Sequence, residues 1–409
     1  MPATADRLFG LSVRFNGVEK PELYNCAETF RVTEEIGHGS TVHLVVMVCR
    51  NDDGSWPHLE EAEMGAWQRV TVTVTVGSHK DVLMDGYISH IHVEQTPQTA
   101  TLKATFTVVD VSYIMGLRPR CKVWPAGKSY EDIAKEIITG KPYNLKATIE
   151  TNPPQAGNDE PRSTVQRGSD LQFLRELARR RGYEFYVLGA TGYFRKPVLE
   201  GTPQKAIASN FGERTNCENL HIFVDATAPL RAVAARVDPY SGKTVAVDAT
   251  TDCGLTPMGT TDVSASRDDS SPVPPTTVLV RRPPALSEAE LKAYLCGLIV
   301  RTSFFLKATG TLNALRYGAI LRARKTVKIF GYGNLYTGTY YVRKVVHTLT
   351  PKTYHMEFEA FRNRMGQISP EDASVLEDPS NAALPLAAGD GADTDVITVS
   401  ETGKRVAPA

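Results

Sequence analysis

The sequence lacks the features that would place it in a membrane or on a nucleic acid. None of its apolar runs reaches the roughly 18 residues that a membrane-spanning helix needs, so we expect no membrane insertion. Its 46 basic and 46 acidic residues cancel, and this balance predicts no stable nucleic-acid binding. The N-terminal residues 1–7 lack the apolar segment of a secretory signal. We therefore expect the chain to be made in the cytoplasm.

Cysteine is scarce and scattered, which excludes two kinds of chemistry. Neighbouring cysteines are more than 20 residues apart, and no Cys-x-x-Cys or Cys/His ligand spacing occurs. This spacing excludes zinc fingers and thioredoxin-type redox motifs. We expect free, mostly buried thiols rather than disulfides at the six positions Cys26, Cys49, Cys121, Cys217, Cys253 and Cys296.

Catalytic motifs are also missing. The sequence contains no Gly-x-Ser-x-Gly, His-Glu-x-x-His, P-loop or Gly-x-Gly-x-x-Gly, so we predict no catalytic residue, no metal site, no cofactor and no enzymatic activity. His90 and His92, with Asp85 nearby, share one strand face at a spacing that could bind a metal. A third ligand has no obvious source, and a solvated strand face is the favoured interpretation. The pairs His38/His43 and His347/His355 carry no stronger signal.

The N-terminal part of the chain is dominated by strand patterns. Residues 70–76 read Val-Thr-Val-Thr-Val-Thr-Val, a strict alternation with valine on one face and threonine on the other. Several further short alternating runs precede and follow it, almost without a helical pattern. We expect residues 1–118 to form a first β-barrel-like domain.

Residues 119–200 change to a mixed pattern and predict a small α/β insert domain. Ser129 is placed to cap one helix, which ends near Gly140. In the stretch 167–187, Ser169 or Asp170 can cap a second helix, apolar residues recur at helical spacing, and Gly182 can end it. Leu174 and Leu177 lie on the apolar face of this helix and are predicted to be buried.

The rest of the chain divides into four parts. Residues 201–250 have a short-strand pattern, and 251–284 have the Gly, Ser, Asp and Pro content of a loop or linker. In 285–365, a helix with a capping box at Ser287 precedes a second β-barrel-like domain. Residues 366–409 carry eight acidic and two basic residues and no aromatic residue, which is typical of a disordered or extended tail.

One stretch resembles a known family. Residues 166–182 resemble the signature Gln-Arg-x-x-Ser-Asp-x-x-Phe-Leu-x-x-Leu-Ala-x-x-x-Gly of phage tail hub proteins, the late control protein D family and the hub portion of VgrG, with one residue instead of two between Arg167 and Ser169. The matching residues are Gln166, Arg167, Ser169, Asp170, Phe173, Leu174, Leu177, Ala178 and Gly182. Segments around 85–91, 338–347 and 354–363 resemble hairpins of the same family, so the resemblance covers residues 7–365.

The resemblance implies an α+β, β-rich fold in which two barrel-like domains flank the insert. Residues 7–115 and 304–363 should then superpose as related folds, with part of the second supplied by 201–250. It also implies a homotrimeric ring in the baseplate of a phage tail or injection particle. The expected partners are the hexameric tail tube protein, a spike protein and other baseplate proteins. Because only about 44 residues follow the last hairpin, we expect the spike to be a separate protein, unlike in VgrG.

Two other functions stay open at this level. One is a tail-tip protein that binds carbohydrate or a receptor, which could use as stacking surfaces the aromatic residues Tyr332, Tyr336, Tyr340 and Tyr341. The other is a hydrolase on a β scaffold, which the missing motifs disfavour.

A cluster of basic residues could form a phosphate or nucleic-acid surface; it consists of Arg175, Arg179, Arg180 and Arg181. Interaction with the helix C-terminus and with nearby carboxylates is the favoured interpretation.

Overall fold

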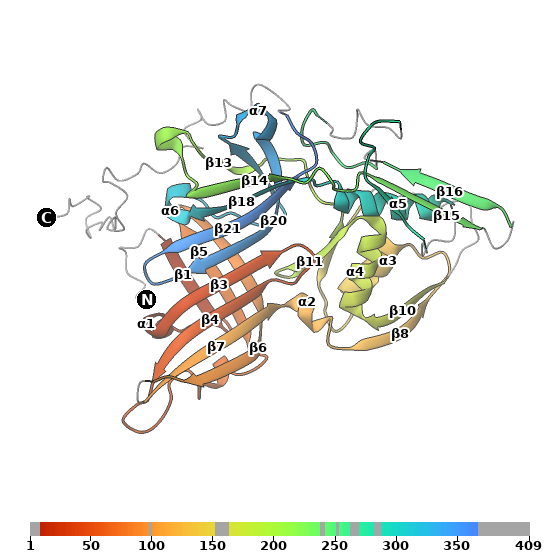
Figure 1. Cartoon of the computed structure of the whole chain (residues 1–409). Helices are drawn as coiled ribbons and strands as arrows, with labels where there is room; N and C mark the ends of the chain where they lie inside the picture. Colours follow the sequence, from red (N-terminus) through yellow and green to blue (C-terminus); the bar gives the residue numbers. More distant parts are fainter. Residues whose placement is uncertain are drawn as a thin grey trace.

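The protein is β-rich, and its two β regions flank a smaller α/β insert (Figure 1). The computed structural model describes residues 9–97, 100–151, 163–237, 242–250, 253–261, 270–281 and 288–366. Among these residues, no helix combines the length and the apolar character that a membrane crossing would require. The predicted tail beyond Gly366 and the predicted cap at Ser287 lie outside the described residues. The β-rich α+β class is confirmed.

The first β region is an antiparallel run with the strand order β2-β1-β5-β6-β7-β4-β3. In β5 the valines are buried, at most 1% exposed, while the threonines between them are partly exposed, as the alternation predicts. Gly86 allows close strand packing, because a Cβ there would lie 2.2 Å from the carbonyl oxygen of Val109. The elements are β1 (Phe9–Phe15), β2 (Val18–Glu19), α1 (Leu23–Cys26), β3 (Ala27–Glu35), β4 (Thr41–Cys49), η1 (Ala62–Met64), β5 (Arg69–Val76), β6 (His79–Gln95), β7 (Thr101–Asp110) and α2 (Val111–Ile114).

The insert has its own core, built by two helices and two small sheets. Its elements are β8 (Pro119–Trp124), α3 (Tyr130–Thr139), β9 (Lys146–Ile149), β10 (Thr164–Ser169), α4 (Asp170–Arg181), β11 (Glu184–Leu188) and β12 (Thr191–Arg195). The predicted caps are confirmed: Ser129 caps α3, and Ser169 and Gln172 form a reciprocal capping box on α4. Leu174 and Leu177 are fully buried.

Gly182 ends α4 in the left-handed conformation, with φ 68°. A Cβ on this residue would lie 2.8 Å from the Cα of Gly297 in helix α5 (Glu288–Thr302). The two glycines therefore let the end of α4 approach the backbone of α5.

The second β region follows the insert and continues the sheet with β20-β21-β18-β14, while β13 and β19 pair beside it. Its elements are β13 (Gln204–Ala208), η2 (Gly212–Arg214), β14 (Asn219–Val224), β18 (Leu306–Asn313), α6 (Ala314–Tyr317), β19 (Thr326–Phe330), α7 (Gly333–Tyr336), β20 (Gly338–Leu349) and β21 (Tyr354–Arg362). Strands β13 and β14 come from the 201–250 range, as expected.

The two β regions are not separate, which contradicts that part of the prediction of two barrels. Whether the two regions superpose stays a prediction. Strand β3 of the first region pairs antiparallel with β20 of the second, so one continuous sheet crosses both. Without this pairing each of these strands would leave a row of backbone groups unpaired at a sheet edge. The side chains also form one core, in which the rings of Phe9 and Tyr354 lie 5.8 Å apart.

An extension formed by α5 and a small sheet packs beside the insert (Figure 1). The sheet consists of β15 (Arg231–Val237), β16 (Thr244–Ala249) and β17 (Thr277–Leu279). Strand β17 lies inside the 251–284 range that was expected to be a linker, and its pairing with β15 places part of that range in folded structure. The six-part domain division of the chain stays a proposal.

Candidate functional site at the junction of the two β regions and the insert

A buried ion pair joins the two β regions beside the β3–β20 pairing. Glu34 of β3 is 1% exposed and lies opposite Val345 of β20. Arg322 donates hydrogen bonds from Nε (2.9 Å) and Nη2 (2.6 Å) to Oε1 of Glu34, and the backbone N–H of Ala323 donates to Oε2 at 3.0 Å. The carboxylate is therefore satisfied by groups that are almost 290 residues away in the sequence.

Electrostatics keep this carboxylate ionised. Burial by itself would raise the pKa of Glu34, but the charge and hydrogen bonds of Arg322, with contributions from the charges of His347 and Arg324, together outweigh burial and lower the pKa to about 2. His347 of β20 is fully buried nearby, and burial lowers its pKa to about 4 although the charge of Glu34 opposes the shift. The Nδ1 atom of His347 and the hydroxyl of Tyr354 are 2.9 Å apart and share a hydrogen bond.

We expect the fold to lose stability as the pH falls from about 6.5 toward 4. In this range the unfolded chain binds a proton on His347 that the folded chain does not bind, because the folded pKa is about 4. Glu34 adds a further loss of stability at lower pH. Between its ordinary pKa and its folded pKa of about 2, the unfolded chain binds a proton on Glu34 that the folded chain does not bind. The His347 contribution is on the order of 3 kcal/mol. Chemical unfolding followed from pH 7 to pH 4 measures it.

The variant His347→Gln should reduce this pH dependence, whereas His43→Gln, on the exposed side of β4, should keep it. An unchanged pH dependence in His347→Gln would contradict the assignment.

Arg324 connects all three parts of the junction. Its Nη2 donates to the carbonyl oxygen of Glu35 in the first β region at 2.8 Å. Its backbone N–H donates to Val342 in β20 at 2.8 Å, and its guanidinium lies 4.7 Å from the ring centroid of Tyr186 in the insert. A single residue thus contacts the insert and both β regions.

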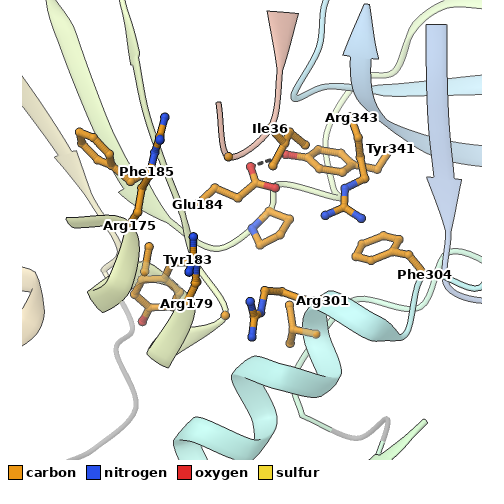
Figure 2. Close-up of a pocket in the computed structure, with 15 residues that line it drawn as sticks. Ile36, Arg175, Arg179, Tyr183, Glu184, Phe185, Arg301, Phe304, Tyr341 and Arg343 are labelled. Carbon is orange, nitrogen blue, oxygen red and sulfur yellow. Dashed lines mark hydrogen bonds between the residues drawn. The ribbon is translucent and has the colours of Figure 1, made fainter. Parts of the chain in front are cut away.

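A second link joins β20 to the insert. The hydroxyl of Tyr341, a residue 1% exposed, donates to Oε2 of Glu184 at 2.7 Å, as Figure 2 shows. Burial raises the pKa of Glu184, although the Tyr341 hydrogen bond and the charges of Arg324, Arg343 and Arg195 oppose the shift. These contacts fix the orientation of the parts and do not form a nucleophile–base arrangement.

Beside this link, α4, β11, α5 and β20 enclose a pocket of about 170 Å³ (Figure 2). We call it the arginine pocket, because Arg175, Arg179, Arg301 and Arg343 line it. Glu184 lines the same pocket, and Ile36, Val300 and Phe304 add apolar surface. The arrangement suits an anionic group that carries some apolar surface.

The structure divides the four basic residues of the α4 segment into two pairs. Arg180 contacts Glu176 at 2.5 Å, and Arg181 lies 3.5 Å from Glu131, as the structural interpretation predicts. Arg175 and Arg179 instead line the arginine pocket. Sequence reasoning missed this pocket because its other two arginines lie on α5 and β20.

The histidines considered as ligands do not form a metal site among the described residues. His92 lies 3.1 Å from Glu94, His90 bonds with Ser89, and Asp85 pairs with Arg69. A β-bulge between Ile88 and His90 also interrupts the regular pairing of this strand. Within the described ranges, no three His, Cys, Asp or Glu side chains come close enough to hold a metal ion.

Of the four tyrosines considered as stacking surfaces, Tyr340 and Tyr341 are not exposed, and Tyr332 and Tyr336 are partly buried. Tyr340 and Tyr341 are at most 1% exposed, and Tyr340 donates its hydroxyl to the carbonyl oxygen of Tyr336 at 2.6 Å. Tyr332 bonds to the carbonyl of Leu220 and packs with Tyr336 against the main core. The fold uses these rings for packing, because their strand and the adjoining turn cover the core.

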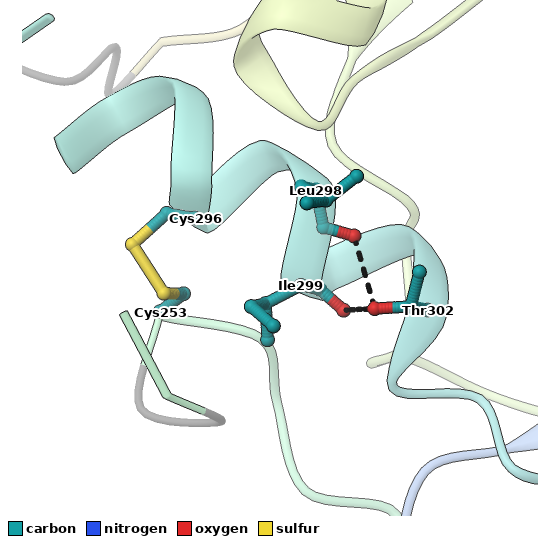
Figure 3. Close-up of a disulfide and its surroundings, with 5 residues drawn as sticks. All are labelled: Cys253, Cys296, Leu298, Ile299 and Thr302. Carbon is teal, nitrogen blue, oxygen red and sulfur yellow. Dashed lines mark hydrogen bonds between the residues drawn. A yellow bond between two sulfur atoms is a disulfide. The ribbon is translucent and has the colours of Figure 1, made fainter. Parts of the chain in front are cut away.

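The expectation of free, mostly buried cysteines is also wrong in part. Cys253 and Cys296 form a disulfide that ties the segment after β16 to α5 (Figure 3). Of the free cysteines, only Cys217 is buried, while Cys49 and Cys121 are exposed. The spacing of the cysteines in the sequence does not predict this disulfide, because the fold brings together two cysteines that are 43 residues apart.

Comparison with known proteins gives matches at the level of structure. No protein-family model and no curated protein sequence matches this chain. A tail protein from Neisseria meningitidis MC58 matches with a TM-score of 0.60 and 12% identity, over 87% of this chain and 97% of the other. The 43 kDa tail protein of prophage MuSo2 from Shewanella oneidensis matches with a TM-score of 0.57 and 11% identity, over 87% and 99% of the two chains.

A chain of the Francisella PdpA–VgrG complex matches with a TM-score of 0.52 and 8% identity; the match covers 88% of this chain and 59% of that one. The phage-tail and VgrG resemblance seen in the sequence is therefore confirmed at the level of fold. The chain has the fold of these two tail proteins, one of them from a prophage, and it shares that fold with a chain of the PdpA–VgrG complex.

Proposed function

We propose that this protein is a structural hub subunit in the baseplate of a phage tail or a related injection particle. The observation that carries the proposal is the extent of the structural match, which includes 97% and 99% of the length of two tail proteins, the second from a prophage. We further propose that the protein performs no catalysis. It assembles in the particle after synthesis in the cytoplasm.

The proposed mechanism is an adaptation of symmetry. Three copies form a ring, and each copy contributes two β regions, so the ring presents six similar faces to a hexameric tail tube protein. The opposite side offers three-fold symmetry to a separate spike protein, and other baseplate proteins bind around the ring. Closed rings of this kind rely on repeated, complementary interfaces. The proposed conduit binds neither nucleic acid nor membrane stably.

The junction described above supports a rigid subunit. The Glu34–Arg322 pair holds the two β regions together, and Arg324 and Tyr341 hold the insert against them. A hub that transmits load between tube and spike requires its parts to keep one orientation. The glycan-binding alternative rested on tyrosines that could serve as stacking surfaces. These tyrosines are buried or packed against the core, so the structure gives this alternative no support.

We expect the full-length protein to form homotrimers, either alone or when mixed with its tube and spike proteins. Light scattering coupled to size-exclusion chromatography should give three times the mass of the chain, and electron micrographs should show three-fold rings. Runs over a range of concentrations serve as the control for nonspecific association. A strictly monomeric protein at high concentration that also fails to trimerise with its tube and spike proteins would contradict the proposal.

A further inference from the structure

The arginine pocket holds more positive charge than its surroundings balance. Burial lowers the pKa of Arg175, with Arg179 adding to the shift and Asp110 opposing it. Burial also lowers the pKa of Arg301, with Arg179 and Arg343 adding to the shift. Arginine does not lose its proton under ordinary conditions, so these guanidinium groups stay charged while partly removed from water. An anion in the pocket would offset that cost.

The nearby carboxylates already have other partners. Asp110 accepts hydrogen bonds from the backbone N–H groups of Ser40 and Ser112, and Glu184 accepts from Tyr341. Among the described residues, no carboxylate lies within ion-pair distance of Arg175, Arg179, Arg301 or Arg343. The Nε atom of Arg175 is buried and has no hydrogen-bond partner in the described part of the chain.

The pocket fits side chains better than a cofactor. Its volume of about 170 Å³ is below the roughly 300–1,000 Å³ of most small-molecule sites. Its lining combines the four arginines with the apolar residues Ile36, Val300 and Phe304. A peptide with carboxylates on both sides of apolar residues would complement both kinds of surface.

We propose that the acidic segment Glu371–Asp378 of this same chain docks in the arginine pocket. It reads Glu-Asp-Ala-Ser-Val-Leu-Glu-Asp, so two acidic pairs flank Val375 and Leu376. This inference does not depend on the proposed hub role.

A series of contacts connects the end of the described chain with the lining of the pocket. Arg362 donates to the carbonyl oxygen of Gly366 and, at 2.8 Å, to that of Met258. Met258 packs in one cluster with Phe304 and Tyr341, which also line the pocket. The five residues from Gly366 to Glu371 span up to about 17 Å when extended.

Limited proteolysis of the full-length protein tests the proposal. Thermolysin cleaves before large apolar residues, so cleavage at Val375 and Leu376 reports on the docked segment. Cleavage at Val396–Val399, farther along the same tail, is an internal reference. In the double variant Arg175→Gln/Arg301→Gln, cleavage at Val375 and Leu376 should become at least about tenfold faster. The reason is that the cleavage rate follows the fraction of molecules in which the segment is not docked. Cleavage at Val396–Val399 should not change.

Matched variants separate docking from misfolding. Arg175→Lys/Arg301→Lys keeps both charges and should retain most of the protection, and Arg31→Gln, on an exposed site of β3, should behave as the wild type. Replacing Glu371, Asp372, Glu377 and Asp378 with their amides leaves the pocket intact and should reproduce the fast cleavage. High salt should also accelerate it.

Three results would overturn the inference. One is equal cleavage of the two tail sites in the wild type. Another is protection that survives in both the pocket double variant and the tail amide variant. The third is protection that disappears on dilution, which would assign the docked segment to a neighbouring copy rather than to the same chain.

Discussion

Replacing Arg322 with Met is expected to lower the free energy of unfolding by about 3–5 kcal/mol. The substitution leaves the Glu34 carboxylate, which is 1% exposed, without the guanidinium that donates to it at 2.6 and 2.9 Å. A buried charge without its partner is among the most destabilising changes a single substitution can make. Chemical unfolding at neutral pH gives the value.

Two controls accompany this experiment. Lys307→Met removes the partner of Glu359 from a pair that is about one-third exposed on each side, and it should cost less than about 1 kcal/mol. The double variant Glu34→Leu/Arg322→Met should recover much of the lost stability, because it removes both charges. If Arg322→Met is no more harmful than Lys307→Met, then Arg322 does not support the junction as described.

Truncating Leu177 or Leu174 to Ala should destabilise the insert by about 2–5 kcal/mol. Both side chains are fully buried between α4 and the rest of the insert core, so each change removes apolar contact and leaves a cavity. Leu117→Ala is the matched control, because Leu117 is 49% exposed and should change stability by no more than about 0.5 kcal/mol. Losses below about 0.5 kcal/mol at both buried sites would show that α4 is not packed as described.

Local patterns in the sequence predicted the individual elements well. Ser169, the apolar face of Leu174 and Leu177, and Gly182 together specified α4, because a cap, a 3.6-residue period and a left-handed stop are properties of consecutive residues. The Val/Thr alternation of β5 specified which face is buried for the same reason. The resemblance in this segment also indicated the correct fold.

These local patterns do not predict contacts between residues that are far apart in the sequence. The β3–β20 pairing joins the two β regions through backbone groups that every residue carries, so alternation alone does not reveal it. The Cys253–Cys296 disulfide depends in the same way on the approach of separate segments.

The sequence by itself determined the β-rich class, the insert, the capped helix and the absence of recognisable catalytic motifs. Only the tertiary structure decided that Arg322 pairs with Glu34, that Tyr341 is buried against Glu184, and that arginines from α4, α5 and β20 share one pocket. Secondary structure follows from interactions over a few neighbouring residues. Burial and charge pairing depend instead on which surfaces meet, and these surfaces are separated by more than 100 residues of chain.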